Sequence, residues 1–220
     1  MKKIGMLTIG QTPRTDVLPP LMEIMGPGYE FVEAGALDGL TKRQVDRLGI
    51  RDDDYVLATR LSDGEEVKIA KRAIIPLLQG KLTELEAGGV RLTVVMCTGK
   101  FPAFKSKGLV VTPSEILRGV LEASLKSGKL AVVYPAIEQI DYLEHEFGRT
   151  GVELYGDYYS PYDSSGLEGL CERLREQKPD LVFLNCFGHG RDLKAAVEDA
   201  TGVPAIQSNA VIAKVLTELA

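Results

Sequence analysis

The chain has 220 residues, a formal net charge of −5 and 45% hydrophobic residues, the composition of a soluble globular protein with one large domain or two small ones. Its basic residues are spread along the sequence, so nucleic acid is not an expected partner. No apolar run approaches the roughly 20 residues of a membrane span, so a membrane is not expected either.

The first ten residues, MKKIGMLTIG, place two lysines before a short apolar run. The run ends at Gly10 without the cleavage site of a signal peptide, so we predict a first β-strand over Lys3–Ile9. Gly10 and Gln11 follow this strand and are candidate ligand contacts. Arg14 stands near the same edge and could hold a carboxylate through two parallel hydrogen bonds. The alternative is a surface arginine in the first helical turn.

After this strand, short β-branched or apolar runs alternate with helical patterns, which is typical of parallel βαβ units. Further strands are predicted at Tyr29–Glu33, Tyr55–Thr59, Leu92–Met96, Leu109–Val111, Leu130–Tyr134, Val152–Tyr155, Leu181–Asn185 and Ala205–Gln207. Helices are predicted at about 15–25, 41–48, 68–88, 114–127, 138–149, 164–177, 190–201 and 209–219. Asp63 and Gly64 stand between two alternating runs and predict an antiparallel hairpin.

Two predicted strands end in the same way, with cysteine and then glycine two residues further on. The sequences are Cys97–Thr98–Gly99 and Cys186–Phe187–Gly188. We therefore expect two α/β lobes. Residues 1–97 and 203–220 would form the lobe that carries Cys97, and residues 98–202 the lobe that carries Cys186.

The carboxyl ends of parallel strands are where open α/β sheets bind ligands. Gly99 and Gly188 would let the backbone approach a ligand closely. A helix that follows each strand would direct backbone N–H groups at the same space, and such groups favour the thiolate form of a cysteine. Thr98 and Phe187 would contribute further contacts.

Two thiols that face each other across a cleft could invert a stereocentre. One removes a proton from carbon, and the other delivers a proton to the opposite face. A carboxylate beside that carbon needs hydrogen-bond donors that strengthen as charge moves onto it. Each cysteine also has a simpler interpretation, as a small apolar residue at the end of a buried strand. The third cysteine, Cys171, lies within a helical pattern and is expected in the core.

Other polar residues stand at strand ends. Tyr134 ends one strand, and Ser208 and Asn209 follow another; they suit an amino or carboxylate ligand, although helix capping alone explains the last two. His189 could polarise a thiol, bind a carboxylate or have no role. His145 is expected to be a solvated helix residue.

The sequence contains no motif that indicates metal or nucleotide binding. The three cysteines form no C-x-x-C, and the two histidines lie far apart, so thiols in a reducing cytoplasm are expected. No glycine-rich nucleotide-binding motif occurs. Pyridoxal phosphate is not excluded by these residues, but nothing calls for it.

Four segments resemble the AroM family: LTIGQTPRTDVLP, PSEILRGVL, VFLNCFGHG and SNAVIAKVLTEL. The family is similar to a branch of the aspartate/glutamate racemase superfamily. The resemblance implies two pseudosymmetric, Rossmann-like α/β lobes with parallel sheets and a cleft between them. It also implies paired catalytic cysteines, here Cys97 and Cys186, acting without pyridoxal phosphate or metal. Phe187 stands where the racemases usually have threonine.

The leading hypothesis is a cofactor-independent racemase or epimerase of an amino acid or related small carboxylate. The first alternative is a superfamily isomerase or decarboxylase that uses one thiol. The second is a non-catalytic protein that binds a small carboxylate. We expect a cytoplasmic protein, and a homodimer is left open as its assembly.

Overall fold

The computed structural model describes all residues, Met1–Ala220. The chain divides into two compact units. The first unit comprises Met1–Pro113 and Ala213–Ala220, and the second comprises Ser114–Ile212. No helix combines the length and the apolar character that a membrane crossing requires.

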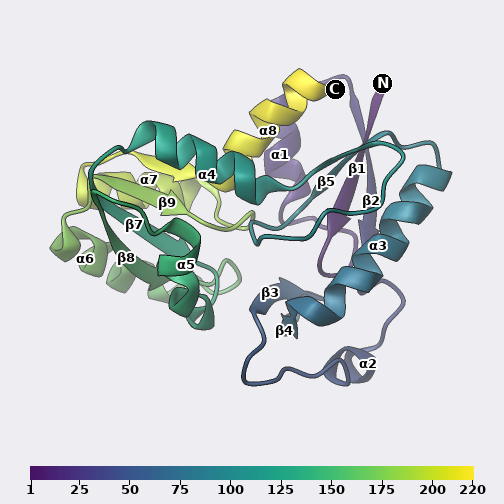
Figure 1. Cartoon of the computed structure of the whole chain (residues 1–220), viewed down its shortest axis with the longest axis horizontal. Coiled ribbons are helices and arrows are strands. Elements are labelled where there is room, and N and C mark those ends of the chain that lie inside the picture. Colours follow the sequence, from purple (N-terminus) through teal and green to yellow (C-terminus); the bar gives the residue numbers. More distant parts are fainter. The chain divides into compact units, whose positions relative to one another are not determined.

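The first unit is built on a four-stranded parallel sheet (Figure 1). The strand order is β2 (Tyr29–Gly35), β1 (Lys2–Thr8), β5 (Leu92–Val95) and β6 (Leu109–Val111). The inner strands β1 and β5 are buried on both faces from Ile4 onward and throughout Leu92–Val95. This burial explains their nearly continuous apolar sequence, which parallel sheets with covered faces require.

Three helices belong wholly to this unit: α1 (Leu18–Met25), α2 (Lys42–Asp46) and α3 (Lys71–Ala87). The longest, α3, packs against β1 and β2. It buries one stripe of side chains with helical spacing: Ile74, Leu78, Leu82 and Leu85. Such a stripe is what an amphipathic helix needs in order to cover one face of a sheet.

A two-stranded antiparallel sheet accompanies the parallel one. It consists of β3 (Val56–Arg60) and β4 (Glu66–Ala70), and it confirms the hairpin predicted at Asp63–Gly64. Gly64 has φ = +94°, a conformation that favours glycine. Because β4 continues to Ala70, α3 begins three residues later than the predicted helix.

The second unit contains another four-stranded parallel sheet. Its order is β8 (Val152–Tyr158), β7 (Gly128–Tyr134), β9 (Leu181–Leu184) and β10 (Ala205–Gln207). The helices are α4 (Pro113–Ser124), α5 (Leu143–Phe147), α6 (Leu167–Gln177), α7 (Arg191–Thr201) and α8 (Ser208–Leu219), with 3₁₀ turns η1 (Ile137–Tyr142) and η2 (Ser164–Gly166). The last turns of α8, from Ala213, belong to the first unit.

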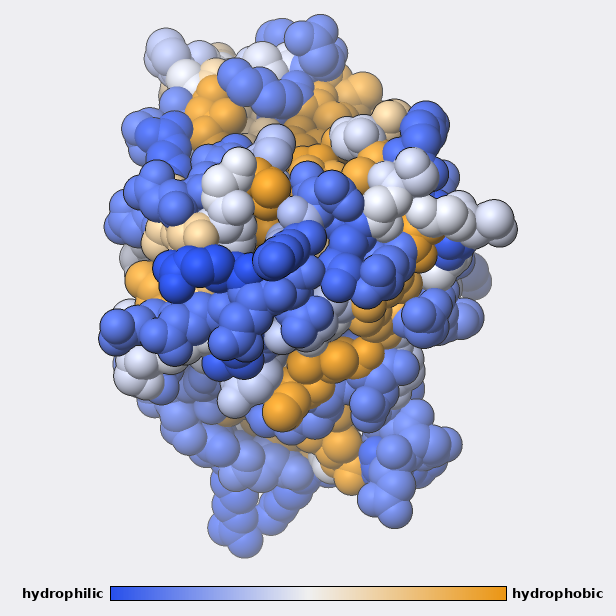
Figure 2. All heavy atoms as spheres, turned by 90° about the vertical axis from the view of Figure 1, so that its left-hand side faces the viewer, coloured by the Kyte–Doolittle hydropathy of each residue, from blue (hydrophilic) through white to orange (hydrophobic).

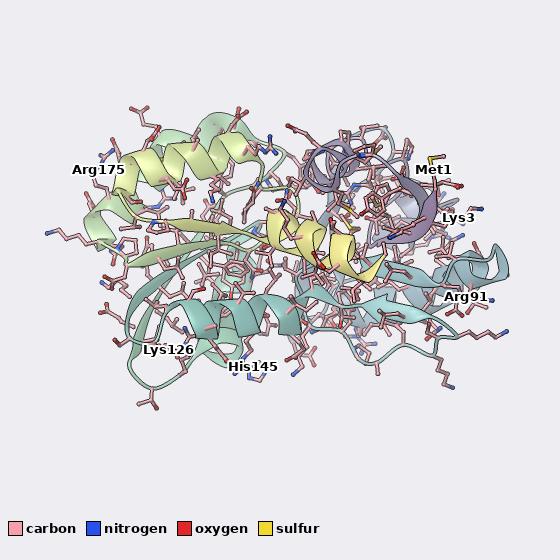
Figure 3. The ribbon with its side chains drawn as sticks, turned by 90° about the horizontal axis from the view of Figure 1, so that it is seen from above. Met1, Lys3, Arg91, Lys126, His145 and Arg175 are labelled. Atoms are coloured by element: carbon pink, nitrogen blue, oxygen red, sulfur yellow. The ribbon has the colours of Figure 1, made fainter.

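Helices α6 and α7 pack together, and α6 also contacts β8. The buried residues of α6 are Leu170, Cys171 and Leu174, so Cys171 is a core residue as predicted. The face on the α6 side is largely hydrophilic (Figure 2). Figure 3 shows Lys126 and Arg175 at the periphery, and His145 is exposed on α5, as expected for a solvated helix residue.

The two sheets repeat one topology. In the first sheet β1 pairs with β2 and β5, and β5 pairs with β6; in the second, β7 pairs with β8 and β9, and β9 pairs with β10. Backbone hydrogen bonds repeat too, since Met96 donates to Leu7 in one unit and Asn185 donates to Val133 in the other. Strands β5 and β9 therefore occupy equivalent positions.

This pairing differs from the expected lobes at two strands. We expected β6 in the second lobe, but it pairs with β5. We expected β10 to return to the first lobe, but it pairs with β9. Both are three-residue edge strands, whose short sequence does not reveal the neighbour with which they pair.

Candidate active site

The two cysteine turns leave equivalent strands at the same point. Cys97 lies two residues after the last residue of β5, and Cys186 lies two residues after the last residue of β9. Both side chains are partly exposed, and neither cysteine is in a disulfide. The carboxyl end of a parallel strand is the usual ligand-binding edge of such sheets.

Each turn holds a glycine close to its sulfur atom. A β-carbon added to Gly99 would lie 3.6 Å from the sulfur of Cys97, and one added to Gly188 would lie 3.7 Å from the sulfur of Cys186. At Gly188 the added atom would also lie 2.7 Å from Cβ of Pro161, which is too close. Glycine is therefore required at 188, whereas at 99 the protein itself leaves room for a methyl group.

In the second unit, a backbone group contacts the sulfur of Cys186 directly. The N–H of Gly188 donates a hydrogen bond of 3.3 Å to this sulfur. A donor aimed at sulfur stabilises negative charge there, and thiolate is the nucleophilic and basic form of cysteine. Helix α7 begins at Arg191, five residues after the cysteine.

The first unit has a different segment after its cysteine. From Met96 to Gly108 the chain forms no helix or strand before β6 begins. A helix N-terminus therefore follows Cys186 but not Cys97, because after Cys97 the chain must first run back along the sheet to start β6. Thr98 is half-buried beside Cys97, and Gly99 is buried.

His189 completes the Cys186 turn, and its backbone N–H donates to the carbonyl of Cys186. Its ring is 1% exposed, and Nε2 lies 2.9 Å from the carbonyl oxygen of Tyr159. Burial lowers the pKa of His189 to about 4, although the bond to Tyr159 acts in the opposite direction. The ring is therefore neutral at pH 7.

The first residues of α8 hold the same turn from another side. Ser208 donates from Oγ to the carbonyl of Leu184 at 2.6 Å, and Asn209 donates from Nδ2 to the carbonyl of Phe187 at 3.2 Å. Both side chains are buried. These bonds fix the backbone on both sides of Cys186, so the structure brings together six of the predicted residues: Cys186, Phe187, Gly188, His189, Ser208 and Asn209.

Tyr134 does not join this group through its hydroxyl. The hydroxyl donates to Glu146 of α5 at 2.8 Å. Burial, with the neighbouring charge of Glu146, raises the pKa of Tyr134 far above its ordinary value. The bond ties β7 to α5, and contact of Tyr134 with a ligand stays a prediction.

The segment that follows β1 contains Gly10, Gln11 and Arg14. Each of these residues contacts other residues of the first unit. A β-carbon on Gly10 would lie 2.3 Å from Oγ1 of Thr59, so glycine is needed for the approach of β3. Gln11 donates to the carbonyls of Leu37 and Leu40, and its oxygen accepts from the N–H of Ser62. Gln11 also lines a pocket of about 420 Å³ with Asp38, Lys42 and Asp63 among others.

Arg14 is 5% exposed and faces a carboxylate of its own chain. Its Nε and Nη2 atoms bond to the two oxygens of Asp16 at 2.9 and 2.7 Å, and Nη1 donates to Thr8 at 2.6 Å. Burial alone would raise the pKa of Asp16, but the hydrogen bonds and charge of Arg14 hold it below its ordinary value. A substrate carboxylate at Arg14 would compete with Asp16.

Sequence reasoning missed three residues that shape the Cys186 turn. Tyr159 bonds to His189 through its carbonyl, Pro161 packs against Gly188, and Gln207 donates from Nε2 to the carbonyl of His189 at 2.6 Å. The signal was present, because residues 159–161 follow β8 and Gln207 ends β10. The same strand-end rule that selected the cysteines would have selected them.

No group of three or more histidine, cysteine, aspartate or glutamate side chains is arranged to hold a metal ion. The third thiol, Cys171, is 9% exposed and lies 3.7 Å from the carbonyl oxygen of Ala196. Burial raises the pKa of Cys171. It therefore lies within a helix, whereas the other two cysteines lie at strand exits.

These features define the fold class. The structure has the α/β fold of the aspartate/glutamate racemase superfamily, as three solved structures illustrate. Maleate isomerase Iso from Pseudomonas putida S16 matches with a TM-score of 0.60 and 15% identity, over 99% of this chain and 92% of that one. Arylmalonate decarboxylase matches with a TM-score of 0.61 and 18% identity, over 98% and 92%. Glutamate racemase from Aquifex pyrophilus matches with a TM-score of 0.59 and 19% identity, over 99% and 84%.

The chain belongs to the AroM family. The family described as AroM protein matches residues 4–220. No curated protein sequence matches the chain significantly. At identities of 14–19% the solved structures establish the fold alone.

Proposed function

We propose that this protein is a cofactor-independent racemase or epimerase of an amino acid or a related small carboxylate. The observation that carries the proposal is the equivalence of Cys97 and Cys186: each lies two residues beyond the corresponding strand of a repeated sheet, and each has a glycine beside its sulfur. A cysteine with a purely structural role needs no equivalent cysteine in the other repeat. A two-thiol acid/base mechanism requires one cysteine in each repeat.

In the proposed reaction, the thiolate of one cysteine takes the proton from the carbon next to the carboxylate. The bonding electrons move into the carboxylate as an enolate. The thiol of the other cysteine then gives its proton to the opposite face of the carbon, which leaves the first sulfur protonated and the second as thiolate. No electron donor or acceptor is required, and the reverse reaction uses the same two groups in exchanged roles.

The enolate needs hydrogen-bond donors at the carboxylate. The backbone N–H groups and the hydroxyl in the Thr98–Gly99 turn, together with the backbone N–H of Phe187, are our candidates, whereas the N–H of Gly188 already donates to the sulfur of Cys186. Arg14 is a further candidate. Because its guanidinium is already paired with Asp16, we assign it a weaker contribution than the turns.

Deuterium exchange tests this function. The protein is incubated in heavy water with both enantiomers of amino acids and 2-hydroxy acids, and the α-proton is followed by NMR. Inversion accompanied by deuterium incorporation is expected, and Cys97→Ser and Cys186→Ser should each lower the inversion rate at least 100-fold. Cys171→Ser is the matched control and should retain the rate. Inversion that survives both replacements would overturn the two-thiol mechanism.

A one-thiol isomerase or decarboxylase is the second candidate. It is favoured by the hydrogen bond from Gly188 to the sulfur of Cys186, which suits a thiol that acts as nucleophile or proton donor. Maleate isomerase and arylmalonate decarboxylase are among the proteins of similar fold. For this candidate, turnover of maleate or an arylmalonate should depend strongly on Cys186 and weakly on Cys97.

A further inference from the structure

Two buried side-chain atoms in the second unit have no hydrogen-bond partner: Nδ1 of His189 and Oδ1 of Asn209. Each of these side chains is 1% exposed. Buried polar atoms of folded proteins are nearly always paired, so each unpaired one calls for an explanation, such as strain, a catalytic role, a water or an ion. Both side chains are anchored on the turn that carries Cys186.

The atom on His189 is an acceptor. Nε2 faces the carbonyl oxygen of Tyr159 at 2.9 Å, and a carbonyl oxygen can only accept, so the hydrogen resides on Nε2. A proton on Nδ1 would make the ring cationic, which its complete burial opposes. Nδ1 therefore presents a lone pair.

The atom on Asn209 is also an acceptor. Its Nδ2 donates to the carbonyl of Phe187 at 3.2 Å. Exchanging the two ends of the amide would place oxygen against oxygen at this contact, so the assignment is fixed by the bond. Oδ1 is then left with its lone pairs unused.

Two neutral acceptors disfavour the carboxylate of a substrate and favour its ammonium group. A carboxylate brings only acceptor oxygens and would be repelled by both lone pairs, whereas an ammonium group brings three N–H donors. An amino acid contains both groups. The backbone N–H donors of the turns suit its carboxylate, and the acceptors suit its amino group.

We propose that His189 and Asn209 form an acceptor subsite that binds the amino group of the substrate. The proposal rests on the proposed function, and it narrows the substrate class from small carboxylates in general to amino acids. His189 and Asn209 are then specificity-determining residues rather than acid/base residues. Aliphatic diacids and 2-hydroxy acids of the same length are poor ligands.

The test compares matched ligands that differ only at the α-carbon. Aspartate, malate and succinate form one set, and glutamate, 2-hydroxyglutarate and glutarate form another; each other amino acid is paired with its deaminated analogue. Binding is measured by calorimetry on the Cys186→Ser variant, so that no turnover is needed. At least one amino acid should bind tenfold or more tightly than its deaminated analogue. Equal affinity in every pair, including no binding by either member, overturns the proposal.

Variants locate the preference. Asn209→Leu and His189→Phe each remove one unpaired acceptor and should reduce the preference for the amino group at least fivefold. Thr201→Val removes a hydroxyl that donates to Val197 within α7 and serves as control. If the unpaired atoms instead hold a structural water, the two variants lose stability while the preference is unchanged, and this result overturns the subsite.

A second measurement uses the wild-type protein and therefore does not require the variants to fold. The ¹⁵N shift of Nδ1 in His189 reports whether that atom accepts a hydrogen bond, and it should move when the preferred amino acid binds to the wild-type protein. An unchanged shift overturns the proposal. The outcome is separate from the two-thiol mechanism: selective binding without deuterium exchange refutes the mechanism alone, and exchange on a hydroxy acid without amino selectivity refutes the subsite alone.

Discussion

The N–H of Gly188 points at the sulfur of Cys186, and the pyrrolidine ring of Pro161 lies where a side chain at 188 would be. The two contacts act together, because the ring holds the backbone in the position from which its N–H reaches the sulfur. Gly99 has the same spacing from Cys97 but only ordinary van der Waals neighbours, at 3.5 Å or more. Gly188 is therefore needed by the fold, whereas Gly99 leaves space that a ligand could occupy.

Replacing the two glycines by alanine should therefore give different results. Gly188→Ala places Cβ 2.7 Å from Pro161, and we expect a loss of about 2 kcal/mol in the free energy of unfolding. Gly99→Ala should change stability by less than about 0.5 kcal/mol yet weaken ligand binding, because the methyl group lies beside the sulfur. Urea unfolding with calorimetric binding measures both effects. Unchanged binding by Gly99→Ala would show that its space is not used.

The three thiols should react in a definite order. Cys97 and Cys186 are partly exposed, whereas Cys171 is buried and burial raises its pKa. The thiolate attacks the carbon of iodoacetamide and displaces iodide, so at pH 8 we expect Cys171 to be labelled at least tenfold more slowly than the other two. Its rate should still rise between pH 8 and 10. Mass spectrometry of peptides after timed quenching measures the rates, and equal labelling of all three would contradict this order.

The pairing of Arg14 with Asp16 should support the exit of β1. Asp16→Asn keeps the shape but leaves the buried guanidinium without its counter-charge, and we expect a loss of about 2 kcal/mol, somewhat below the range for breaking fully buried pairs. The pKa of Asp16 is below its ordinary value, so this stabilisation is present above pH 4 and is lost as pH falls through the lowered pKa. Denaturant unfolding measures the loss. Arg14→Lys is the partner variant and should lose the bidentate bond at similar cost.

His189 predicts a second acid-sensitive window. Its pKa is about 4 in the folded chain against 6.5 for an ordinary histidine. Between these values the unfolded chain binds a proton that the folded chain does not, so stability falls as pH drops from 6.5 to about 4 and then levels off. The shift corresponds to roughly 3 kcal/mol.

His189→Gln removes this titration while an amide can still donate toward Tyr159. Denaturant unfolding at pH 7.5, 6, 5 and 4 compares the two proteins, and the variant should show a flatter profile. The window at and below pH 4 should remain, because it belongs to carboxylates such as Asp16. Parallel profiles for the two proteins would show that His189 is not a buried neutral group.

The sequence predicts the bounds of two short edge strands and the places of both cysteine turns. Leu109–Val111 and Ala205–Gln207 have the predicted bounds, and both cysteines lie at strand exits. Neither the sheet to which these two short strands belong nor the environment of Arg14 could be predicted. A three-residue edge strand carries no periodic pattern, and the partner of an arginine depends on how the chain turns after β1.

Contacts between distant segments account for the remaining differences. Gly10 was expected to admit a ligand, but the segment that approaches it is Thr59 and Arg60 of β3. The amide of Gln11 holds loops of the first unit, and the residue also lines a pocket, so its expected contact with a ligand stays a prediction. The unpaired atoms of His189 and Asn209 have no sequence signature, because satisfaction of a polar group is decided only after packing.

Strand β10 and the start of α8 contribute the side chains that hold the Cys186 turn, and they emerge from the ribosome roughly 20 residues after it. Until Gln207, Ser208 and Asn209 are made, the carbonyls of Leu184, Phe187 and His189 lack these donors. In a nascent chain that ends after α7, the turn that carries Cys186 would thus lack its final conformation. Translation itself delays assembly of the reactive turn until this late segment has been synthesised.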